Sequence, residues 1–360
     1  MRVTQVRIAV VDVPQTAVVA PYRSRMRSSS TTRSGIALVE TDEGLTGCGE
    51  FNVNFLDGIS ARKLEQDAGE WLAGRDPLNI NVFHRDCPLE TRLKSGVEMA
   101  LWDICGQAAD QPLAVLLGGI LRQEVKLAAC MGIAPYGRAG ELATYYVEQG
   151  FTALKTKAGA DMQEDLEMVR GIRDAVGDKL QLRIDPNCGY TREQSAELAQ
   201  RLEEYDLQYL EQPLPDAPLS DAVWLRAQTK TRIALNESVT DPASVIEIIK
   251  LGAADFVLPD THIAGGIQPC VDIGRICAAA GLPCIMHCGH DLGPKTAAMV
   301  HVAAAGSAYS LPNDCTYYGL EDDVLTERLE IVEGKIRVPD RPGLGITIDP
   351  EKLERFRVDC

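Results

Sequence analysis

The chain has 360 residues, of which 45% are hydrophobic and 24% charged, and its net charge is −16. This length suits one large domain with a smaller one in an ordinary globular protein. The acidic balance argues against nucleic acid or an anionic membrane as a partner, since both need a basic face, and no apolar run approaches the ~20 residues of a membrane span.

The N-terminal segment 1–13 alternates like a strand and contains no apolar leader, so we expect no signal peptide. The eleven cysteines include no CxxC pair, and reduced, buried thiols are typical of the cytoplasm, which is the predicted location. Two further strands are predicted at 35–40 and 47–51, joined by a hairpin turn at 41–44. Helices are predicted within 59–118.

The segment 21–34, between the first two predicted strands, is rich in Arg, Ser and Thr. A solvated surface turn and a lid that binds substrate oxygens both fit this composition, and the residues farther along the chain favour the lid. Arg23 and Arg25 are therefore candidate substrate-binding residues. We expect the loops at 15–34 and 50–57 to select the substrate.

From residue 125 onward, short apolar segments alternate with helical patterns, which predicts parallel strands with right-handed crossovers. The strands run from 125–131 to 309–311 and number eight, enough to close a barrel. A doubly wound open sheet is the alternative, but the chain lacks the GxGxxG or GxxxxGK[ST] turn such a sheet normally carries. The tail, about 322–360, which includes 330–338, is expected to return and pair with the N-terminal strands. The predicted helices are 138–149, 162–176, 192–205, 219–229, 242–251, 267–280 and 294–304.

Polar residues recur in the second half of the chain at intervals of 23–28 residues, mostly after a short apolar run. One strand, helix and return loop takes roughly 25–30 residues, so this spacing predicts one functional residue per βα unit, gathered at one mouth of a barrel. The series is Lys155 and Lys157, Asp185, Glu211, Glu237, Asp260 and His287.

Three of these residues are carboxylates: Asp185, Glu211 and Glu237. Converging without a counter-charge, they would repel one another and raise their pKa values. A hard divalent cation resolves the repulsion, and all-oxygen ligands suit Mg²⁺. Surface acids or helix caps are the alternative, which the regular spacing disfavours.

The remaining polar residues provide two candidate bases. Lys155 and Lys157 share one face of a strand, and crowding or a metal would lower a lysine pKa towards that of a useful base. Asp260 is expected to hydrogen-bond His287, fix its tautomer and raise its basicity. His290, and more weakly His262, compete with His287 for this role. Two bases around metal-bound oxygens suit removal of the proton beside a carboxylate, with return of a proton or assistance to a leaving group.

Short motifs along almost the whole chain resemble those of the enolase superfamily, specifically its mandelate racemase-like subgroup. The related muconate-lactonizing-like subgroup has Lys where Asp260 stands, which decides between the two. The matching motifs are Gly-Leu-Thr-Gly-Cys-Gly-Glu (44–50), Ala-Leu-Trp-Asp-Ile (100–104), Leu-Leu-Gly-Gly (116–119), Leu-Lys-Thr-Lys (154–157), Ile-Asp-Pro-Asn (184–187), Leu-Glu-Gln-Pro (210–213), Asn-Glu-Ser (236–238), Pro-Asp-Thr-His-Ile-Ala-Gly-Gly (259–266) and Pro-Gly-Leu-Gly (342–345).

The resemblance implies an α/β fold: a modified TIM barrel, (β/α)₇β, over 121–321. An α+β capping domain would be built from 1–120 with the C-terminal segment 322–360. Relatives are commonly dimers to octamers, so a homo-oligomer is expected.

The resemblance also implies roles for the site residues. Mg²⁺ would bind Asp185, Glu211 and Glu237; Lys157 would be the base on one face and the His287–Asp260 pair would act on the other; Lys155 would neutralise the substrate carboxylate, with Asn187 a polar contact nearby. The subgroup often places an acidic hydrogen-bond donor at the end of the eighth strand, where this chain offers only Asn313 or Asp314.

These residues predict a small-molecule carboxylate as substrate. The first hypothesis is a Mg²⁺-dependent dehydratase of a sugar acid or hydroxy acid, giving a 2-keto acid. A racemase or epimerase, or a cycloisomerase, would use the same bases. A non-catalytic binding protein of the same fold is disfavoured by the intact metal ligands and bases.

Overall fold

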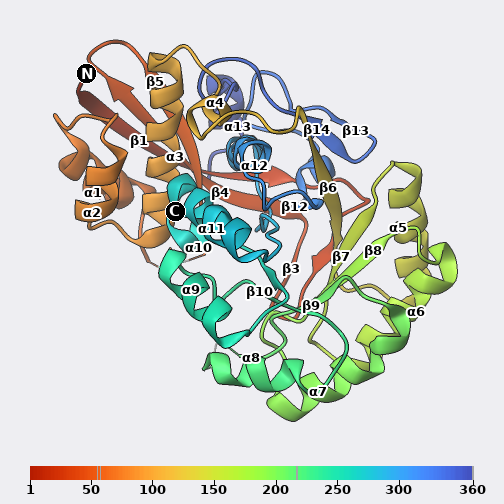
Figure 1. Cartoon of the computed structure of the whole chain (residues 1–360). Helices are drawn as coiled ribbons and strands as arrows, with labels where there is room; N and C mark the ends of the chain where they lie inside the picture. The colour runs from red at the N-terminus through yellow and green to blue at the C-terminus, as the bar shows by residue number, and fades with distance from the viewer. Residues whose placement is uncertain (55, 57, 216–217, 359–360) are drawn as a thin grey trace.

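The computed structural model describes residues 1–54, 56, 58–215 and 218–358. Of the predicted loop 50–57, Phe55 and Asp57 lie outside these residues. The N-terminal region forms an antiparallel sheet in the order β1 (Val3–Pro14), β4 (Thr31–Thr41) and β5 (Thr46–Asn52), which confirms the three predicted strands. Helices α1 (Ala61–Leu72), α2 (Ile80–Asp86) and α3 (Thr91–Ala108) complete this layer (Figure 1).

Helix α3 lies very close to β5 because glycine occupies the contact points. A Cβ at Gly47 would lie 2.0 Å from the carbonyl oxygen of Ala100, and one at Gly49 would lie 1.9 Å from that of Gly96. Any side chain there would push the helix away. The apolar faces of the sheet and helices form one buried cluster that includes Val10, Phe51, Leu64, Val97 and Leu101.

The second region is the predicted barrel. Six strands are hydrogen-bonded in parallel and in sequence order, as buried apolar strands of α/β proteins are. Segment 284–287 takes the seventh position, because its backbone bonds to Val257 and Pro259 on one side and to Asp314 on the other. The eighth strand, β12 (Asn313–Cys315), pairs with the first and closes the ring. The six strands are β6 (Glu124–Met131), β7 (Ala153–Lys157), β8 (Gln181–Asp185), β9 (Tyr209–Glu211), β10 (Ile233–Leu235) and β11 (Phe256–Val257).

The crossover helices surround this ring and match the predicted helices, three of them residue for residue (Figure 1). They are α5 (Tyr136–Glu148), α6 (Met162–Val176), α7 (Arg192–Arg201), α8 (Leu219–Arg226), α9 (Pro242–Leu251), α11 (Ile267–Ala280) and α12 (Gly293–Ala305); short helices lie at α4 (Leu113–Leu116), α10 (Thr261–Ala264), η1 (Glu203–Tyr205) and η2 (Tyr317–Gly319). Within the described residues, no helix is long and apolar enough to cross a membrane.

One detail of the expected fold was wrong. The eighth strand, expected at 309–311, begins at Asn313, because Tyr309 turns its side chain into the core and its hydroxyl binds the carbonyl of Cys270. The tail does not use 330–338 for its return: β13 (Ile331–Val332) and β14 (Lys335–Arg337) form a hairpin that extends β6 antiparallel.

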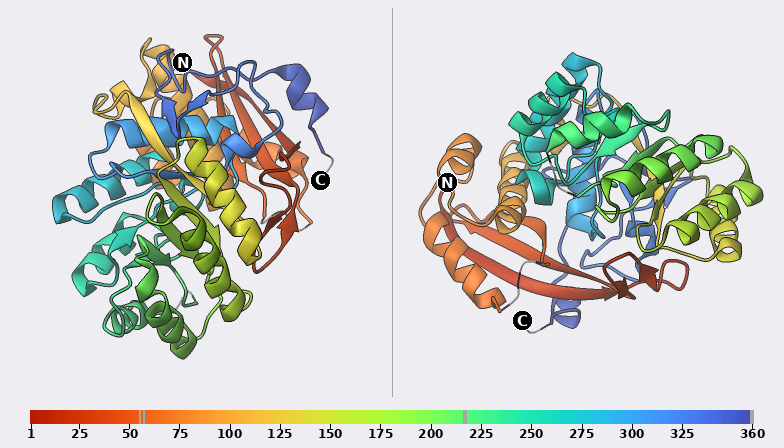
Figure 2. Two further views of the ribbon diagram at one scale, coloured as in Figure 1. Left: turned by 90° about the vertical axis from the view of Figure 1, so that its right-hand side faces the viewer. Right: turned by 90° about the horizontal axis from the view of Figure 1, so that it is seen from below.

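The chain does return to the N-terminal sheet, but about twenty residues later. After α13 (Pro350–Arg355), Phe356 accepts a hydrogen bond from the backbone of Asp12, and Val358 donates one to Val10. Both chain ends therefore lie at the N-terminal region (Figure 2).

Three buried carboxylates hold the N-terminal region to other parts of the chain, two of them to the barrel. Glu50 accepts hydrogen bonds from the backbone nitrogens of Leu292 and Lys295 at the start of α12. Glu98 does the same for Ile267 and Gln268 at the start of α11. These acids cap helices of the other region, a position that the helix dipole favours. Asp103, the third, binds the backbone of Cys48 and of Leu344 in the C-terminal segment.

Candidate active site

The predicted polar residues meet at the carboxyl ends of the barrel strands, the end at which barrel enzymes place their chemistry. Lys155 and Lys157 lie on β7, and strand register sets Lys157 directly beside Asp185 of β8. Glu211 ends β9, and Glu237 follows β10 by two residues. Asp260 follows β11, and His287 ends the seventh barrel segment. The parallel register therefore gathers residues that lie far apart in sequence.

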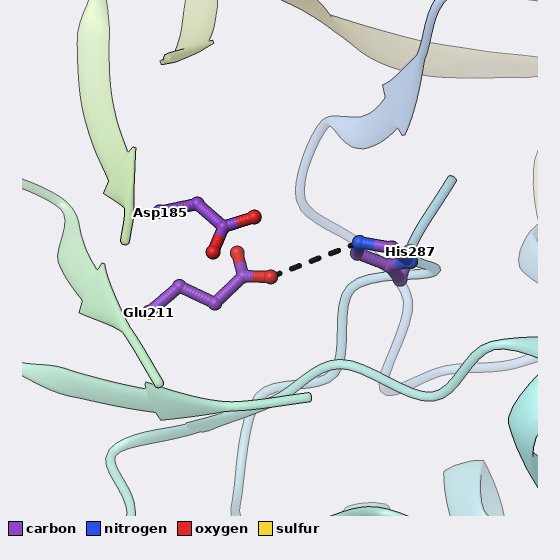
Figure 3. A group of neighbouring side chains, drawn as sticks. All are labelled: Asp185, Glu211 and His287. Carbon is purple, nitrogen blue, oxygen red and sulfur yellow. Dashed lines mark ion pairs between the residues drawn. The ribbon is translucent and has the colours of Figure 1, made fainter. Parts of the chain in front are cut away.

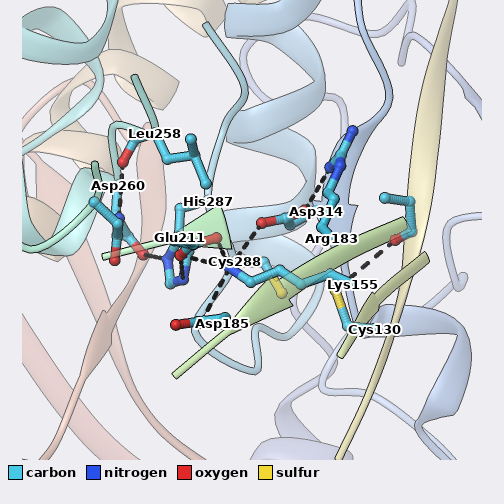
Figure 4. Close-up of polar contacts among 12 residues, drawn as sticks. Cys130, Lys155, Arg183, Asp185, Glu211, Leu258, Asp260, His287, Cys288 and Asp314 are labelled. Carbon is cyan, nitrogen blue, oxygen red and sulfur yellow. Dashed lines mark hydrogen bonds and ion pairs between the residues drawn. The ribbon is translucent and has the colours of Figure 1, made fainter. Parts of the chain in front are cut away.

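Lys155 is the centre of a buried ion cluster (Figure 4). Its ammonium lies 2.7 Å from Glu211, 3.1 Å from Asp314 and 3.3 Å from Asp185. Burial alone would lower the Lys155 pKa, but the three carboxylates outweigh it and raise that pKa. Lys155 is thus a fixed positive charge under the mouth of the barrel.

Lys157 contacts Asp185 directly. Burial opposes its charge, but Asp185 outweighs burial and raises the Lys157 pKa. For Asp185, the two ammonium groups outweigh burial in turn, and its pKa is lowered. The lowering of the lysine pKa that we expect from crowding together with the metal stays a prediction. In the protein alone, the nearest neighbour of Lys157 is a carboxylate, which acts in the opposite direction.

His287 and Asp260 form a hydrogen-bonded pair, with 2.8 Å between Nδ1 and Oδ2. The other ring nitrogen of His287, Nε2, is buried, has no hydrogen-bond partner among the described residues, and lies 3.8 Å from Glu211. Burial and the charge of Lys155 lower the His287 pKa. With Nδ1 protonated and bonded to Asp260, Nε2 carries the lone pair that a base requires.

A buried lysine that the sequence reasoning missed supports this pair from behind. Lys295, on α12 and 1% exposed, lies 2.9 Å from Oδ1 of Asp260 and 3.0 Å from Asp291. Its ammonium is also 3.4 Å from Nδ1 of His262, whose pKa burial and Lys295 lower to about 3. The sequence signal was weak: a lone Lys in an apolar helix.

The carboxylates fit a hard cation. Asp185, Glu211 and His287 each offer an atom within 4.8 Å of the others (Figure 3). Glu237, the third predicted ligand, is not in this trio, because Asn187 holds its Oε1 at 3.2 Å. Its Oε2, however, is buried without a partner among the described residues, and Asn187 also binds Asp185 through its backbone nitrogen. Oxygen donors predominate, which suits Mg²⁺ better than a softer metal.

A cavity of about 420 Å³ opens above the lysines. Its outer wall comes from the N-terminal region, as a small hairpin of β2 (Tyr22–Arg23) and β3 (Ser28–Ser29). The predicted loop is therefore an ordered hairpin over the barrel mouth. The lining includes Gln15, Tyr22, Ser24, Arg25, Met26, Arg27, Ser29, Thr31, Asn52, Asn54, Asn187, His290 and Thr316, besides Lys155, Lys157, Glu237 and His287.

Three predicted substrate-binding residues do not line this cavity. Arg23 pairs with Glu164 on α6 through two hydrogen bonds of 2.8 and 2.9 Å, and so fastens the hairpin to the barrel. Asn313 accepts a hydrogen bond from the backbone of Met286 within the barrel wall. Asp314 lies beneath Lys155 and binds the buried Arg183 at 2.7 Å. The other two, Arg25 and Asn187, do line the cavity.

Comparisons with known proteins identify the class. Residues 5–118 match the family model of the mandelate racemase/muconate lactonizing enzyme N-terminal domain, and residues 138–352 match that of the enolase C-terminal domain-like family. The chain belongs to the mandelate racemase/muconate lactonizing enzyme family of the enolase superfamily, in its mandelate racemase-like subgroup, and is an enzyme of that superfamily.

Individual relatives catalyse different reactions. The chain is 34% identical to the arabinonate dehydratase of Saccharolobus solfataricus over 73% of this chain and 71% of that protein. It is 30% identical to the hydrophobic dipeptide epimerase of Enterococcus faecalis over 87% of this chain and 91% of that protein. The structure of a dipeptide epimerase from Enterococcus faecalis, complexed with Mg and the dipeptide L-Leu-L-Tyr, superposes with a TM-score of 0.86 at 27% identity, covering 96% of this chain and all of that one. Family members thus bind Mg²⁺ and small molecules, and include both lyases and isomerases.

Proposed function

We propose that this enzyme abstracts the α-proton of a hydroxylated carboxylate in a Mg²⁺-dependent reaction and then eliminates water across the α and β carbons, giving a 2-keto acid. The observation that carries the proposal is the pairing of two bases at one end of the cavity with a wall of hydroxyl-binding groups at the other. Asp185, Glu211 and Glu237 are the proposed ligands. The metal, when bound, would supply the positive charge that makes so weak a carbon acid reactive.

The cavity wall favours a sugar acid over a dipeptide. Its donors and acceptors include amides, hydroxyls and guanidinium groups, beside the less polar Tyr22, exposed Met26 and three cysteines, Cys130, Cys188 and Cys288. A hydrophobic dipeptide would leave many of these polar groups unpaired, which is costly. A cationic amino acid would find no lining carboxylate except Glu237, a proposed ligand.

Gln15 adds a specific acceptor for a hydroxyl. Its amide nitrogen lies 3.1 Å from Thr32 and 3.2 Å from Nδ1 of His290. Its carbonyl oxygen is buried without a partner among the described residues. A buried acceptor without a donor is destabilising, and a substrate hydroxyl would satisfy it.

The residues divide the reaction as follows. Lys155, held by three carboxylates, binds the substrate carboxylate as a fixed charge. Lys157 removes the α-proton, and His287, oriented by Asp260, delivers a proton to the departing β-hydroxyl. The C–H and C–O bonds break, water leaves, and the enol rearranges to the 2-keto acid. Lys157 and His287 lie on non-adjacent strands, so they approach the substrate from different directions.

One observation favours a second candidate, a racemase or epimerase. Burial lowers the His287 pKa and so favours the neutral imidazole, which accepts a proton more readily than it gives one. Two bases that each accept and return a proton would invert the α-carbon without loss of water. A cycloisomerase would begin with the same proton transfer.

The decisive experiment is incubation in D₂O with Mg²⁺ and a panel of sugar, hydroxy and amino acids, followed by a 2-keto-acid assay and proton NMR. We expect a keto acid from at least one sugar acid. Deuterium at the α-carbon without keto acid would instead establish the racemase or epimerase. If neither keto acid nor deuterium at the α-carbon is found, both candidate functions are contradicted. The cytoplasmic location, the homo-oligomeric state and the boundaries 1–120, 121–321 and 322–360 stay predictions.

A further inference from the structure

The β2–β3 hairpin carries two guanidinium groups into the cavity, and no carboxylate of the described residues neutralises them. Arg25 donates to the backbone oxygen of Asn187 at 3.1 Å, and Arg27 donates to Oδ1 of Asn54 at 3.1 Å. Both partners are neutral. Within the described part of the chain, neither guanidinium has an ion-pair partner, whereas Arg23 on the same hairpin pairs with Glu164. The hairpin therefore presents uncompensated positive charge to the cavity.

The hairpin's own contacts fix these charges in place. The backbone nitrogen of Ile133 donates to the oxygen of Arg23 at 2.7 Å. A Cβ at Gly132 would lie 2.4 Å from the nitrogen of Arg23, so glycine permits this close contact. The turn between the two strands closes through Ser24, whose nitrogen donates to the oxygen of Arg27 at 2.8 Å. Arginines held this way lose less conformational entropy on binding than mobile surface arginines.

The two guanidinium groups line the same cavity as the catalytic lysines. Arg25 touches Asn187, which itself binds Asp185 and Glu237. The same 420 Å³ cavity is lined by Lys155 and Lys157 at its floor and by Arg25 and Arg27 at its outer wall. The floor holds the lysines together with the proposed metal ligands, and the outer wall holds the two arginines. With neutral hydrogen-bonding groups between them, these two ends complement a short chain that is anionic at both ends.

The protein's overall charge makes this positive patch more informative. The whole chain carries −16, yet residues 21–34 include four arginines and no acid. General surface charge would therefore repel a dianion, and the hairpin counters that repulsion at the cavity entrance. A neutral or cationic far end on the substrate would leave the patch without a partner.

We propose that the substrate carries a second oxyanion at the end distant from the reacting carbon, a carboxylate bound by Arg25 and Arg27, so that the enzyme acts on hydroxylated dicarboxylic acids. This inference rests on the proposed function. Arginine forks match carboxylate oxygens in pairs, and the polar groups between the two ends match the hydroxyls of the chain. A terminal phosphate has the same chemistry and is separated from the carboxylate by the experiment.

The test compares matched pairs of acids with Mg²⁺: aldaric acids, aldonic acids of the same length and stereochemistry, and the terminally phosphorylated aldonic acids. The readout is the ratio of kcat/KM for diacid to that for monoacid, from 2-keto-acid formation. We expect the wild type to favour a diacid at least tenfold. Arg27→Met should lower that ratio on the order of tenfold, mainly through KM, with Arg27→Lys intermediate and Arg25→Met similar.

Arg23→Met is the matched control, because Arg23 fastens the same hairpin but is already neutralised. It should reduce turnover of both acids by a similar factor and leave the ratio unchanged. Melting curves confirm that the exposed hairpin variants remain folded.

Three outcomes would overturn the inference. Preference for monoacids, or a ratio that Arg27→Met does not change, overturns it while leaving the proposed function intact. Preference for phosphorylated acids with the same dependence on Arg27 keeps an oxyanion subsite but overturns the second carboxylate. Keto acid from no substrate overturns the proposed function together with this inference.

Discussion

The barrel and the N-terminal region contribute opposite kinds of surface to one cavity. On the barrel side, Lys155, Asp185 and Glu211 are buried, charged and paired with one another. On the N-terminal side, Arg25 and Arg27 are exposed, and the partners they have among the described residues are neutral. The difference indicates a division of labour: rigid strands hold the groups that react, while a separate hairpin holds the groups that recognise the rest of the substrate.

Removing Lys157 should have the largest effect. Lys157→Ala deletes the proposed α-proton base, and loss of a general base typically costs 10²–10⁴-fold in rate. We expect kcat to fall by about 10³-fold while Mg²⁺ affinity is retained, measured by calorimetry on the same preparation. Turnover within tenfold of wild type would mean that the base is another residue. It would contradict the inference that the barrel side holds the groups that react.

Lys295→Met should separate the two bases. It removes the ammonium that binds Oδ1 of Asp260, so the His287 ring loses part of its orientation, an effect expected to cost about 10–100-fold. The loss should be selective: solvent deuterium exchange promoted by His287 should fall, while exchange promoted by Lys157 persists. Lys295→Arg is the matched control and should recover part of the lost rate. Equal loss of both exchanges would assign Lys295 a purely structural role.

Glu237→Gln and His287→Asn distinguish two possible metal sites. The trio that lies together contains His287, whereas the proposed ligands are Asp185, Glu211 and Glu237. If Glu237 is a ligand, Glu237→Gln should weaken Mg²⁺ binding at least tenfold and His287→Asn should change it little. The reverse result would make His287 a ligand and remove it from the pair of bases. Calorimetric titration with Mg²⁺ alone decides the question without any substrate.

The barrel side was predictable from sequence because its residues obey a period. One polar residue per βα unit identified Asp185, Glu211 and His287, and parallel register then sets them side by side. Helix boundaries followed from the same alternation. Glu237 was also found by this period, but its orientation was not, because Asn187 competes for its carboxylate.

The N-terminal side was less predictable because a loop has no period. Arg23 and Arg25 look alike in sequence, and only the position of Glu164, more than a hundred residues away, shows that Arg23 is neutralised and Arg25 is not. Asn313 and Asp314 failed as cavity residues for a similar reason: the eighth strand begins later than its apolar pattern suggests, which buries both side chains in the barrel wall.

The smallest effect is expected at Asp103, which joins the N-terminal region to the C-terminal segment, and it concerns stability and not catalysis. Burial raises the pKa of Asp103 to about 6, against an ordinary value near 3.9, although backbone donors from Leu344 and Cys48 oppose the rise. Because the folded pKa is the higher one, the folded state binds the proton more tightly. The stabilising contribution is therefore complete below about pH 4 and is lost as pH rises through 6.

Asp103→Asn should remove this pH dependence. The variant loses one backbone acceptor and is less stable than wild type at pH 4, but the gap in unfolding free energy should narrow by about 2–3 kcal/mol by pH 7. Denaturant unfolding at pH 4, 5, 6 and 7 measures it, and kcat at neutral pH should change little, since Asp103 is remote from the lysines. A constant gap would mean that Asp103 stays ionised when folded. The contact with the C-terminal segment would then hold a true buried charge, as the barrel mouth does.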